Sequence, residues 1–128
     1  MKLALEDAGL DPAAIGYVNT HGTATSTGDV AESRATANVF GRPVPVSTIK
    51  NYIGHTLGAC GVIEAWLSIH MMKEKWFCPN INLAELDPEV GALDYITGSG
   101  REIDTEYIMS NNFAFGGVNT SLVFRNSK

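Results

Sequence analysis

The chain has 128 residues, of which 45% are hydrophobic, and its formal net charge is −5. This size and composition fit one globular domain over residues 1–128 and argue against a disordered chain. The negative charge argues against nucleic acid as a partner, and no apolar run is long enough for a membrane span, so no membrane partner is expected.

The N-terminal part of the sequence predicts a helix, a strand and a loop. Residues 2–8 form an amphipathic pattern, and Gly9 marks its end. Residues 15–19 predict a short strand. The next segment, residues 20–28, is too rich in Thr and Gly to be helical. It is either a binding loop, because hydroxyls and flexible backbone follow a strand, or an ordinary polar connection.

A second helix is predicted over residues 29–40, and a strand over residues 43–49 follows it. Asp29 is the expected N-cap, and Glu32 lies three positions after it. That spacing is typical of a capping box, in which the Glu32 side chain bonds back to the amide of the cap residue.

The middle of the chain carries the first chemical signal. Lys50 and His55 lie in a glycine-marked turn between the strand and a long apolar helix predicted over residues 56–76. Ligands of α/β folds gather at such strand-to-helix turns. Because a helix N-terminus disfavours an imidazolium, His55 is expected to be a neutral hydrogen-bond donor. Glu64 lies among apolar helix residues, so its carboxylate requires a cation, a metal or several donors.

Short strands are predicted after this helix, over residues 77–83, 93–97, 107–112 and 120–125. The Gly116-Gly117 pair lies between the last two of these strands. It either allows close approach of the backbone to a ligand or forms a hairpin turn.

The two cysteines, Cys60 and Cys78, lack the spacing of a metal or redox site. We expect buried reduced thiols, which suit a cytoplasmic protein. The first residues contain acidic side chains where a signal peptide requires an apolar core, so no signal peptide is expected.

Three segments resemble one enzyme family. They are Asn19-Thr-His-Gly-Thr-Ala-Thr25, Lys50-Asn-Tyr-Ile-Gly-His-Thr-Leu-Gly-Ala59 and Asn112-Phe-Ala-Phe-Gly-Gly-Val-Asn119. In this order they resemble the β-ketoacyl-[acyl carrier protein] synthases, the condensing enzymes of fatty-acid synthesis. The resemblance covers nearly the whole chain. It is closer to the type I and II enzymes than to modular polyketide synthases.

The resemblance implies an α/β, thiolase-like fold, of which this chain is the second, C-terminal half: a mixed sheet packed against helices. In the family the nucleophilic cysteine lies in the first half, and no cysteine of this chain lies in a motif of that kind. Met1 falls where a complete enzyme would be in mid-sequence. Ala114 replaces a common glycine before Phe115, which bears on the freedom of the expected gate there, and Val118 replaces a threonine.

The active-site residues of the family match positions of this chain. Its two histidines match His21 and His55, and its lysine matches Lys50. The acid that partners the lysine matches Glu32, which gives this residue a second implied role besides capping. The backbone amide of the oxyanion hole falls on Phe115, whose ring resembles the gate to the acyl pocket.

The resemblance also implies two binding sites. The threonines that contact the phosphopantetheine arm of the acyl carrier protein match Thr23 and Thr25. Many members hold a structural monovalent cation, which would supply the buried carboxylate of the apolar helix with a charge partner; no other cofactor is implied. The positions that match this cation site are Asn19, Glu64, Ser110 and Asn111.

The family reaction is a decarboxylative Claisen condensation, in which malonyl-carrier loses carbon dioxide and its carbanion attacks an acyl thioester. This chain is expected to carry the decarboxylation half of such an acyltransferase, and to be inactive alone because the nucleophilic cysteine is absent. Its expected partners are the acyl carrier protein, the missing N-terminal half and a second copy in a family-like homodimer. The alternative is a non-catalytic remnant or a partner-binding subunit. A thiolase is less favoured, because no cysteine lies beside Gly116-Gly117.

Overall fold

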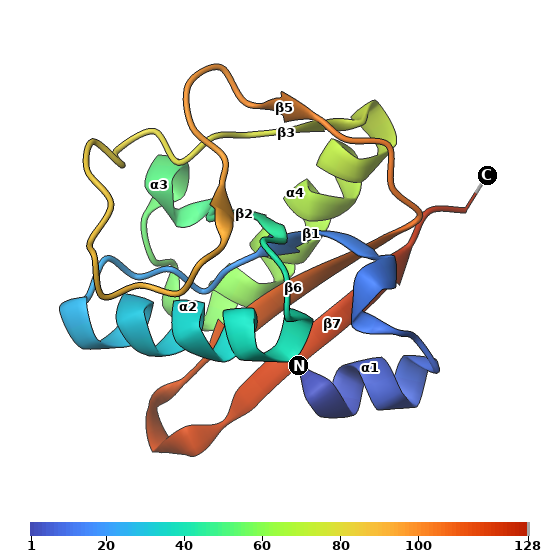
Figure 1. Cartoon of the computed structure of the whole chain (residues 1–128), viewed down its shortest axis with the longest axis horizontal. Coiled ribbons are helices and arrows are strands. Elements are labelled where there is room, and N and C mark those ends of the chain that lie inside the picture. The colour runs from blue at the N-terminus through green and yellow to red at the C-terminus, as the bar shows by residue number, and fades with distance from the viewer. Residues whose placement is uncertain (128) are drawn as a thin grey trace.

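The structure is a computed structural model that describes residues 1–127. Its centre is a sheet with the strand order β4-β2-β1-β6-β7 (Figure 1). The helical elements are α1 (Lys2–Ala8), η1 (Pro12–Ala14), α2 (Ser26–Phe40), α3 (Lys50–Ile53), η2 (Leu57–Ala59), α4 (Cys60–Glu74) and η3 (Phe115–Gly117). The strands are β1 (Ile15–Asn19), β2 (Pro45–Ser47), β3 (Trp76–Phe77), β4 (Asp94–Tyr95), β5 (Arg101–Glu102), β6 (Tyr107–Phe113) and β7 (Asn119–Arg125).

The sheet is mixed, as expected. Strand β1 pairs in parallel with both β2 and β6, and β2 pairs in parallel with β4. Strand β7 runs antiparallel to β6 and forms a hairpin with it. Because parallel strands end at the same edge of a sheet, the segments that follow β1 and β2 meet there.

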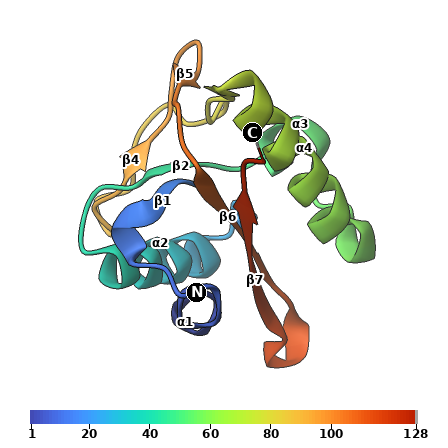
Figure 2. The same ribbon diagram turned by 90° about the vertical axis from the view of Figure 1, so that its right-hand side faces the viewer.

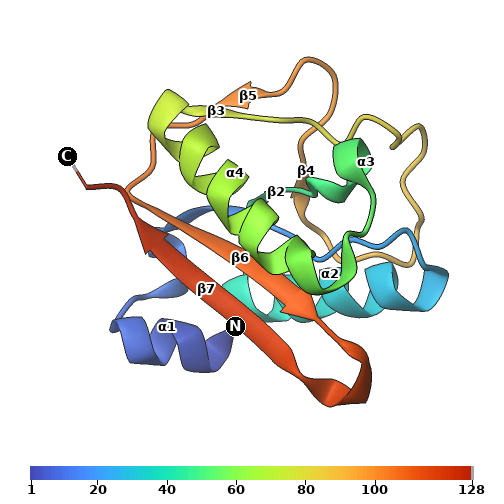
Figure 3. The same cartoon turned by 180° about the vertical axis from the view of Figure 1, so that it is seen from behind.

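Helices cover both faces of this sheet. Helices α1 and α2 lie on one face and α4 on the other, where it lies in front of β6 in the view of Figure 3 (Figures 2 and 3). Each face has its own apolar cluster, since alternate strand residues point to opposite sides. The buried cluster under α1 and α2 comprises Leu5, Ile15, Val18, Phe40, Val44, Val46 and Met109. The cluster under α4 comprises Tyr17, Met72, Phe77, Ile96 and Ile108.

Helix α2 begins earlier than the sequence indicates, and the expected N-cap is wrong. The cap position is Thr25, whose backbone is extended, and its side chain makes no capping hydrogen bond. The amide of Asp29 donates to the Thr25 carbonyl over 2.9 Å, which is the first regular turn of the helix. Asp29 is therefore a residue of the first turn, where a carboxylate favours the helix dipole.

The long helix expected over residues 56–76 is divided. Lys50 opens the separate short helix α3, which ends at Gly54 with a positive φ of 72°. The 3-10 turn η2 then leads into α4. Helix α4 ends at Lys75, which adopts the left-handed conformation. This division fixes His55 in a connecting segment, shortly before the start of α4.

The strand expected over residues 77–83 is reduced to β3, which pairs with β5 in a separate two-stranded sheet. The sequence did not predict β5. The pairing depends on Gly100, because a Cβ atom there would lie 2.6 Å from the Trp76 ring and 2.7 Å from the Phe77 carbonyl oxygen. The expected strands near the C-terminus are confirmed as β4, β6 and β7.

Asn80 joins the carboxyl end of β2 to the segment after β4. Its Nδ2 donates to the carbonyls of Val46 and Ile96, over 3.2 and 3.1 Å. Its Oδ1 accepts from the Thr48 amide over 3.1 Å and from Asn51 Nδ2 over 3.2 Å. The side-chain amide of Asn80 thus fixes the backbone immediately before Lys50.

We therefore expect Asn80→Ala to lower the free energy of unfolding by about 2–3 kcal/mol, because several backbone groups lose their partner at once. Urea unfolding of the chain measures this change. Asn82→Ala is the matched control, because Asn82 is exposed. An equal loss of unfolding free energy in both variants would show that the hydrogen bonds of the Asn80 side chain do not stabilise the fold.

Candidate functional site

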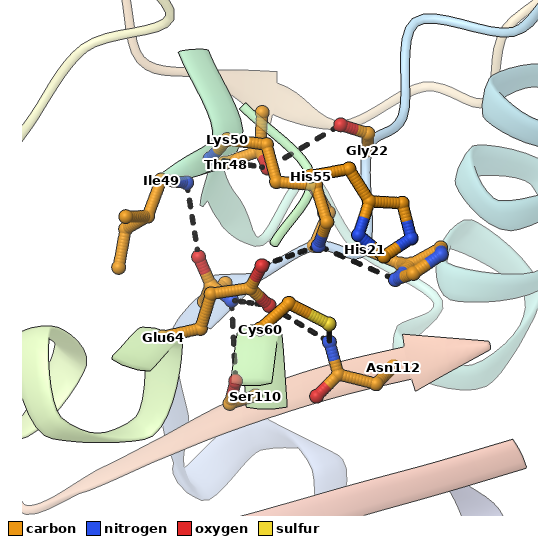
Figure 4. A network of polar contacts seen from close by, with 12 residues as sticks. His21, Gly22, Thr48, Ile49, Lys50, His55, Cys60, Glu64, Ser110 and Asn112 are labelled. Atoms are coloured by element: carbon orange, nitrogen blue, oxygen red, sulfur yellow. Dashed lines mark hydrogen bonds and ion pairs between the residues drawn. The ribbon is translucent and has the colours of Figure 1, made fainter. Parts of the chain in front are cut away.

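Three expected active-site residues meet at the carboxyl edge of the parallel strands. His21 follows β1, Lys50 follows β2, and His55 follows α3 (Figure 4). Lys50 Nζ lies 3.3 Å from Nδ1 of His21. The rings of His21 and His55 are 5.2 Å apart between centroids and nearly perpendicular, at 89°. The structure therefore brings together residues that are 34 positions apart in the sequence (55 − 21).

Hydrogen bonds fix where each imidazole carries its proton. Nδ1 of His55 accepts the backbone N–H of Leu57 over 3.1 Å. Nδ1 of His21 faces the ammonium of Lys50, which has no acceptor, so this nitrogen accepts as well. In a neutral ring the proton then lies on Nε2. Both rings consequently present an Nε2–H donor.

The electrostatic surroundings keep His21 uncharged. Burial, followed by the charges of Lys50 and His55, lowers the pKa of His21 from 6.5 to about 4. At physiological pH the ring is neutral and remains a single donor through Nε2. In this state the ring is a fixed hydrogen-bond donor, which is the kind of group that can stabilise a developing negative oxygen.

The low pKa of His21 gives a testable titration. Between pH 6.5 and about 4 the unfolded chain binds a proton that folded His21 does not, so stability from this group is lost as the pH falls through that window. We expect the NMR midpoint of His21 near pH 4. Replacing the ion pair in Lys50→Met/Glu64→Gln removes the nearby cation and moves this midpoint upward. Lys73→Met, at the exposed end of α4, leaves it in place; an equal shift in both variants would contradict the assigned cause.

Lys50 is paired with Glu64, and the expected pairing with Glu32 is wrong. The ammonium of Lys50 donates to Oε1 of Glu64, and both side chains are buried. The other oxygen of Glu64, Oε2, accepts from Asn112 Nδ2 over 2.8 Å (Figure 4). It also accepts from Asn19 Nδ2 over 3.3 Å. The buried carboxylate of α4 therefore has both a cation and neutral donors, which offset the cost of its burial.

Glu32 instead anchors the loop that carries His21. Its two oxygens accept the backbone amides of His21 over 2.8 Å and of Gly22 over 2.9 Å. Neither the capping-box bond nor a direct bond to Lys50 occurs, because the carboxylate points away from its own helix terminus to this loop. Burial raises the pKa of Glu32 to about 7; the two amides oppose this rise, and the charge of Lys50 opposes it least.

The two threonines of the expected phosphopantetheine site are neighbours. Thr23 Oγ1 lies 3.1 Å from Thr25 Oγ1, and both hydroxyls are on the loop between β1 and α2. Gly28 leaves room for this arrangement, because a Cβ atom there would lie 2.4 Å from Thr25 Oγ1. A cavity of about 470 Å³ opens beside this loop, with Thr25 in its wall, and the two histidines do not line it.

The side chains expected to bind a monovalent cation do not fit that role. Asn19, Glu64 and Ser110 lie together, with Asn19 Nδ2 donating to Ser110 Oγ over 3.1 Å and Asn19 Oδ1 accepting from the Ile49 amide over 3.3 Å. Asn111 points to the opposite face of β6, where its Oδ1 accepts from Ser121 Oγ over 2.7 Å. The ammonium of Lys50 occupies the place at Glu64 that a metal cation was expected to fill. Within residues 1–127, no cluster of three or more His, Cys, Asp or Glu side chains could hold a metal.

Phe115 lies in η3, at the tip of the β6–β7 hairpin, and its side chain is fully exposed. The aromatic ring that approaches His21 belongs to Phe113, with 6.0 Å between centroids. Ala114 has an extended backbone, with φ −107° and ψ 159°, which alanine adopts without strain. Gly116 and Gly117 both have φ 81°, so the turn between the strands requires glycine.

Sequence reasoning missed the pairing of Lys50 with Glu64 and any role for Asn112. The need of a buried glutamate for a cation was a usable signal, but Lys73 is nearer to Glu64 along the chain than Lys50 is, so sequence distance did not identify the partner. No comparable signal pointed to Asn112, whose contact depends on α4 packing against β6.

Fold and site together are those of a thiolase-like condensing-enzyme domain. Residues 1–84 match the family described as "Beta-ketoacyl synthase, C-terminal domain". The chain belongs to this β-ketoacyl synthase family, and the sequence-based resemblance to its C-terminal part is confirmed.

Individual relatives agree with this assignment. The chain is 41% identical to 3-oxoacyl-[acyl-carrier-protein] synthase 2 of Staphylococcus aureus, over 98% of this chain and 32% of the relative. It matches the crystal structure of a β-ketoacyl synthase from Burkholderia phymatum with a TM-score of 0.98 and 62% identity, over 100% of this chain and 31% of that one. A ketosynthase from Xenorhabdus doucetiae, solved in complex with its chain length factor, gives a TM-score of 0.88 and 38% identity, over 96% of this chain and 31% of that one. The chain thus spans about a third of the length of these relatives.

None of the helices within residues 1–127 has both the length and the apolar character needed to cross a bilayer.

Proposed function

We propose that this chain supplies the decarboxylation half of the active site of a 3-oxoacyl-[acyl carrier protein] synthase. The observation that carries the proposal is the pair of Nε2–H donors on His21 and His55, in rings 5.2 Å apart. As carbon dioxide leaves a malonyl thioester, negative charge develops on the thioester oxygen. Two fixed donors beside that oxygen stabilise the charge in the transition state. A preorganised donor of this kind is worth about 3–4 kcal/mol.

Lys50 and Glu32 support the donors in different ways. Lys50 holds Nδ1 of His21 as an acceptor and keeps the ring neutral, while Glu32 fixes the backbone of the loop at His21 and Gly22. Thr23 and Thr25 would bind the phosphopantetheine arm of the carrier, and the closeness of their hydroxyls supports this. A solved relative shows an acyl-carrier protein in complex with its ketosynthase, which supports an acyl carrier protein as the partner here. The two free cysteines suit a cytoplasmic setting.

The rest of the reaction requires a first half with a nucleophilic cysteine. Cys60 and Cys78 are both buried. Sγ of Cys60 lies 3.8 Å from Asn112 Nδ2, and Sγ of Cys78 lies 3.9 Å from Ser47 Oγ. The acyl group would be carried by the first half, and the amide of Phe115 would donate to the acyl carbonyl oxygen. A homodimer, as in the family, would complete the assembly.

The deciding experiment joins this chain to a first half that carries the cysteine, and measures carbon dioxide release and condensation from malonyl- and acyl-carrier. We expect both products from the joined protein and no condensation from the chain alone. Robust condensation by residues 1–128 alone would refute the proposed division of labour, and a joined, folded protein that releases no carbon dioxide would refute the proposed activity.

The outer face of α4 offers a surface for the first half. Val62 and Trp66 lie one helical turn apart on this face and are 76% and 58% exposed. Apolar side chains of this size are seldom left in water together, so a covering partner is favoured. This surface would serve a non-catalytic subunit equally well, and only the neutral donor pair favours the enzyme.

For the chain alone we expect self-association through this face, which sedimentation measures. Trp66→Lys reduces it, because a lysine side chain on the surface opposes apolar contact. Leu3→Lys on α1 is the matched control, since Leu3 is also exposed, at 79%, on the other side of the sheet. A wild-type chain that stays monomeric at high concentration would contradict the inferred interface.

A further inference from the structure

Asn112 contacts the buried centre of the site from the sheet side. It belongs to β6, where Ser110 and Asn112 point to α4 because strand side chains alternate. Its Nδ2 donates to Oε2 of Glu64 over 2.8 Å, and the same nitrogen lies 3.8 Å from Cys60 Sγ (Figure 4). Glu64 itself is completely buried. Of the two neutral donors to Oε2 of Glu64, Asn112 makes the shorter hydrogen bond, since Asn19 Nδ2 lies 3.3 Å from the same oxygen.

We propose that Asn112 is a positioning residue of the active site. Its side-chain amide fixes the carboxylate of Glu64, and that carboxylate holds the ammonium of Lys50 against Nδ1 of His21. This inference rests on the proposed function for its catalytic consequence, but the contacts that carry it stand without it.

The contacts from Asn112 through Glu64 and Lys50 to His21 form a series in which each contact constrains the next. With Oε2 of Glu64 occupied by amide donors, Oε1 is left to accept from Lys50. Lys50 then has a fixed direction, and its Nζ lies 3.3 Å from Nδ1 of His21. An ammonium at Nδ1 excludes the tautomer with its proton on that nitrogen. Asn112 therefore acts on the reacting face of His21, Nε2, without touching it.

Helix α4 is built to admit this side chain. A Cβ atom at Gly61 would lie 2.9 Å from Oδ1 of Asn112 and 3.7 Å from its Cγ. An alanine at this position must therefore displace the amide, although alanine is the residue most favourable to a helix. Gly61 is one turn before Glu64, so the helix that presents the carboxylate also makes room for the residue that orients it.

The test reads the tautomer of His21 by ¹⁵N NMR of the imidazole at neutral pH, in the whole chain. In the wild type we expect an unprotonated Nδ1 and a protonated Nε2. Asn112→Leu removes the amide from β6, and Gly61→Ala displaces it from α4. Both variants are expected to shift the two ¹⁵N signals toward each other, as in a mixture of tautomers.

A matched control separates positioning from simple strand damage. Thr120→Val removes a hydroxyl that donates to the Asn112 carbonyl over 3.4 Å, and leaves the side-chain amide in place. This variant is expected to keep the wild-type spectrum. In the joined synthase, Asn112→Leu and Gly61→Ala are expected to lower the rate of decarboxylation about tenfold or more with little change in KM.

The outcomes separate the two proposals. Folded Asn112→Leu and Gly61→Ala chains that both keep the wild-type His21 signals would overturn the positioning role. Shifted signals with a joined wild-type protein that releases no carbon dioxide would leave the positioning role intact and refute the proposed function. Gly61→Ala replaces a glycine within a helix by alanine, so this variant is expected to fold. It therefore still tests the positioning role if Asn112→Leu does not fold.

Discussion

Glu64→Ala is expected to lower the free energy of unfolding of the chain by about 3–5 kcal/mol, because it leaves the ammonium of Lys50 buried without its anion. The side chains of Lys50 and Glu64 are only 4% and 0% exposed, so water cannot replace the lost partner. Urea unfolding, with the midpoint and the slope both fitted, measures the change.

Two further variants show that burial is the cause. Asp104→Ala breaks the pair of Lys75 and Asp104, whose atoms are 2.7 Å apart but whose side chains are 49% and 73% exposed. We expect a loss below about 1 kcal/mol there. Lys50→Met/Glu64→Leu replaces both buried charges and is expected to restore most of the stability, because no charge is left unpaired. If Glu64→Ala and Asp104→Ala cost the same, the buried pair is not the stabilising contact that its geometry indicates.

The sequence could predict those parts of the site that depend on local patterns, but not the contact between Lys50 and Glu64. Lys50 and His55 were expected between a strand and the long helix, and they lie there, although Lys50 belongs to the short helix α3 and not to a turn. Helical spacing also showed that Glu64 lies among apolar residues. Helical spacing could not show that Lys50 contacts Glu64 on α4, because this contact depends on how α3 and α4 are connected through Gly54.

The fold shows the same limit. Strands β1, β6 and β7 were predicted because each has a local apolar pattern and a local end signal. Strands β3 and β5 are two residues each, and their pairing is decided by the close approach of Gly100 to the Trp76 ring. The sequence of β5 has no apolar alternation and that of β3 gave the wrong length, so only the folded chain specifies this pair. Glu32 is a similar case: its spacing fitted a capping box, but the loop at His21 offered two amides.

In the joined synthase, His55→Ala is expected to lower the rate of malonyl-carrier decarboxylation about 10²–10³-fold, with little change in KM. His55 supplies its Nε2–H only because the Leu57 amide occupies Nδ1, and alanine leaves no donor at this place. His21→Ala should cost a similar factor, since its ring is held in the same tautomer by Lys50. Release of carbon dioxide from labelled malonyl-carrier measures both.

Acyl transfer to the cysteine of the first half is the internal control, because that step does not use the donor pair in the proposed mechanism. Both histidine variants are expected to load an acyl group at close to the wild-type rate and then to stall. His55→Gln keeps an N–H donor on a side chain of similar reach, so it should retain more activity than His55→Ala. A His55→Ala protein that loads normally and still decarboxylates at the wild-type rate would remove the imidazole pair from the mechanism, since a donor that matters only in the transition state cannot be lost without a cost in rate.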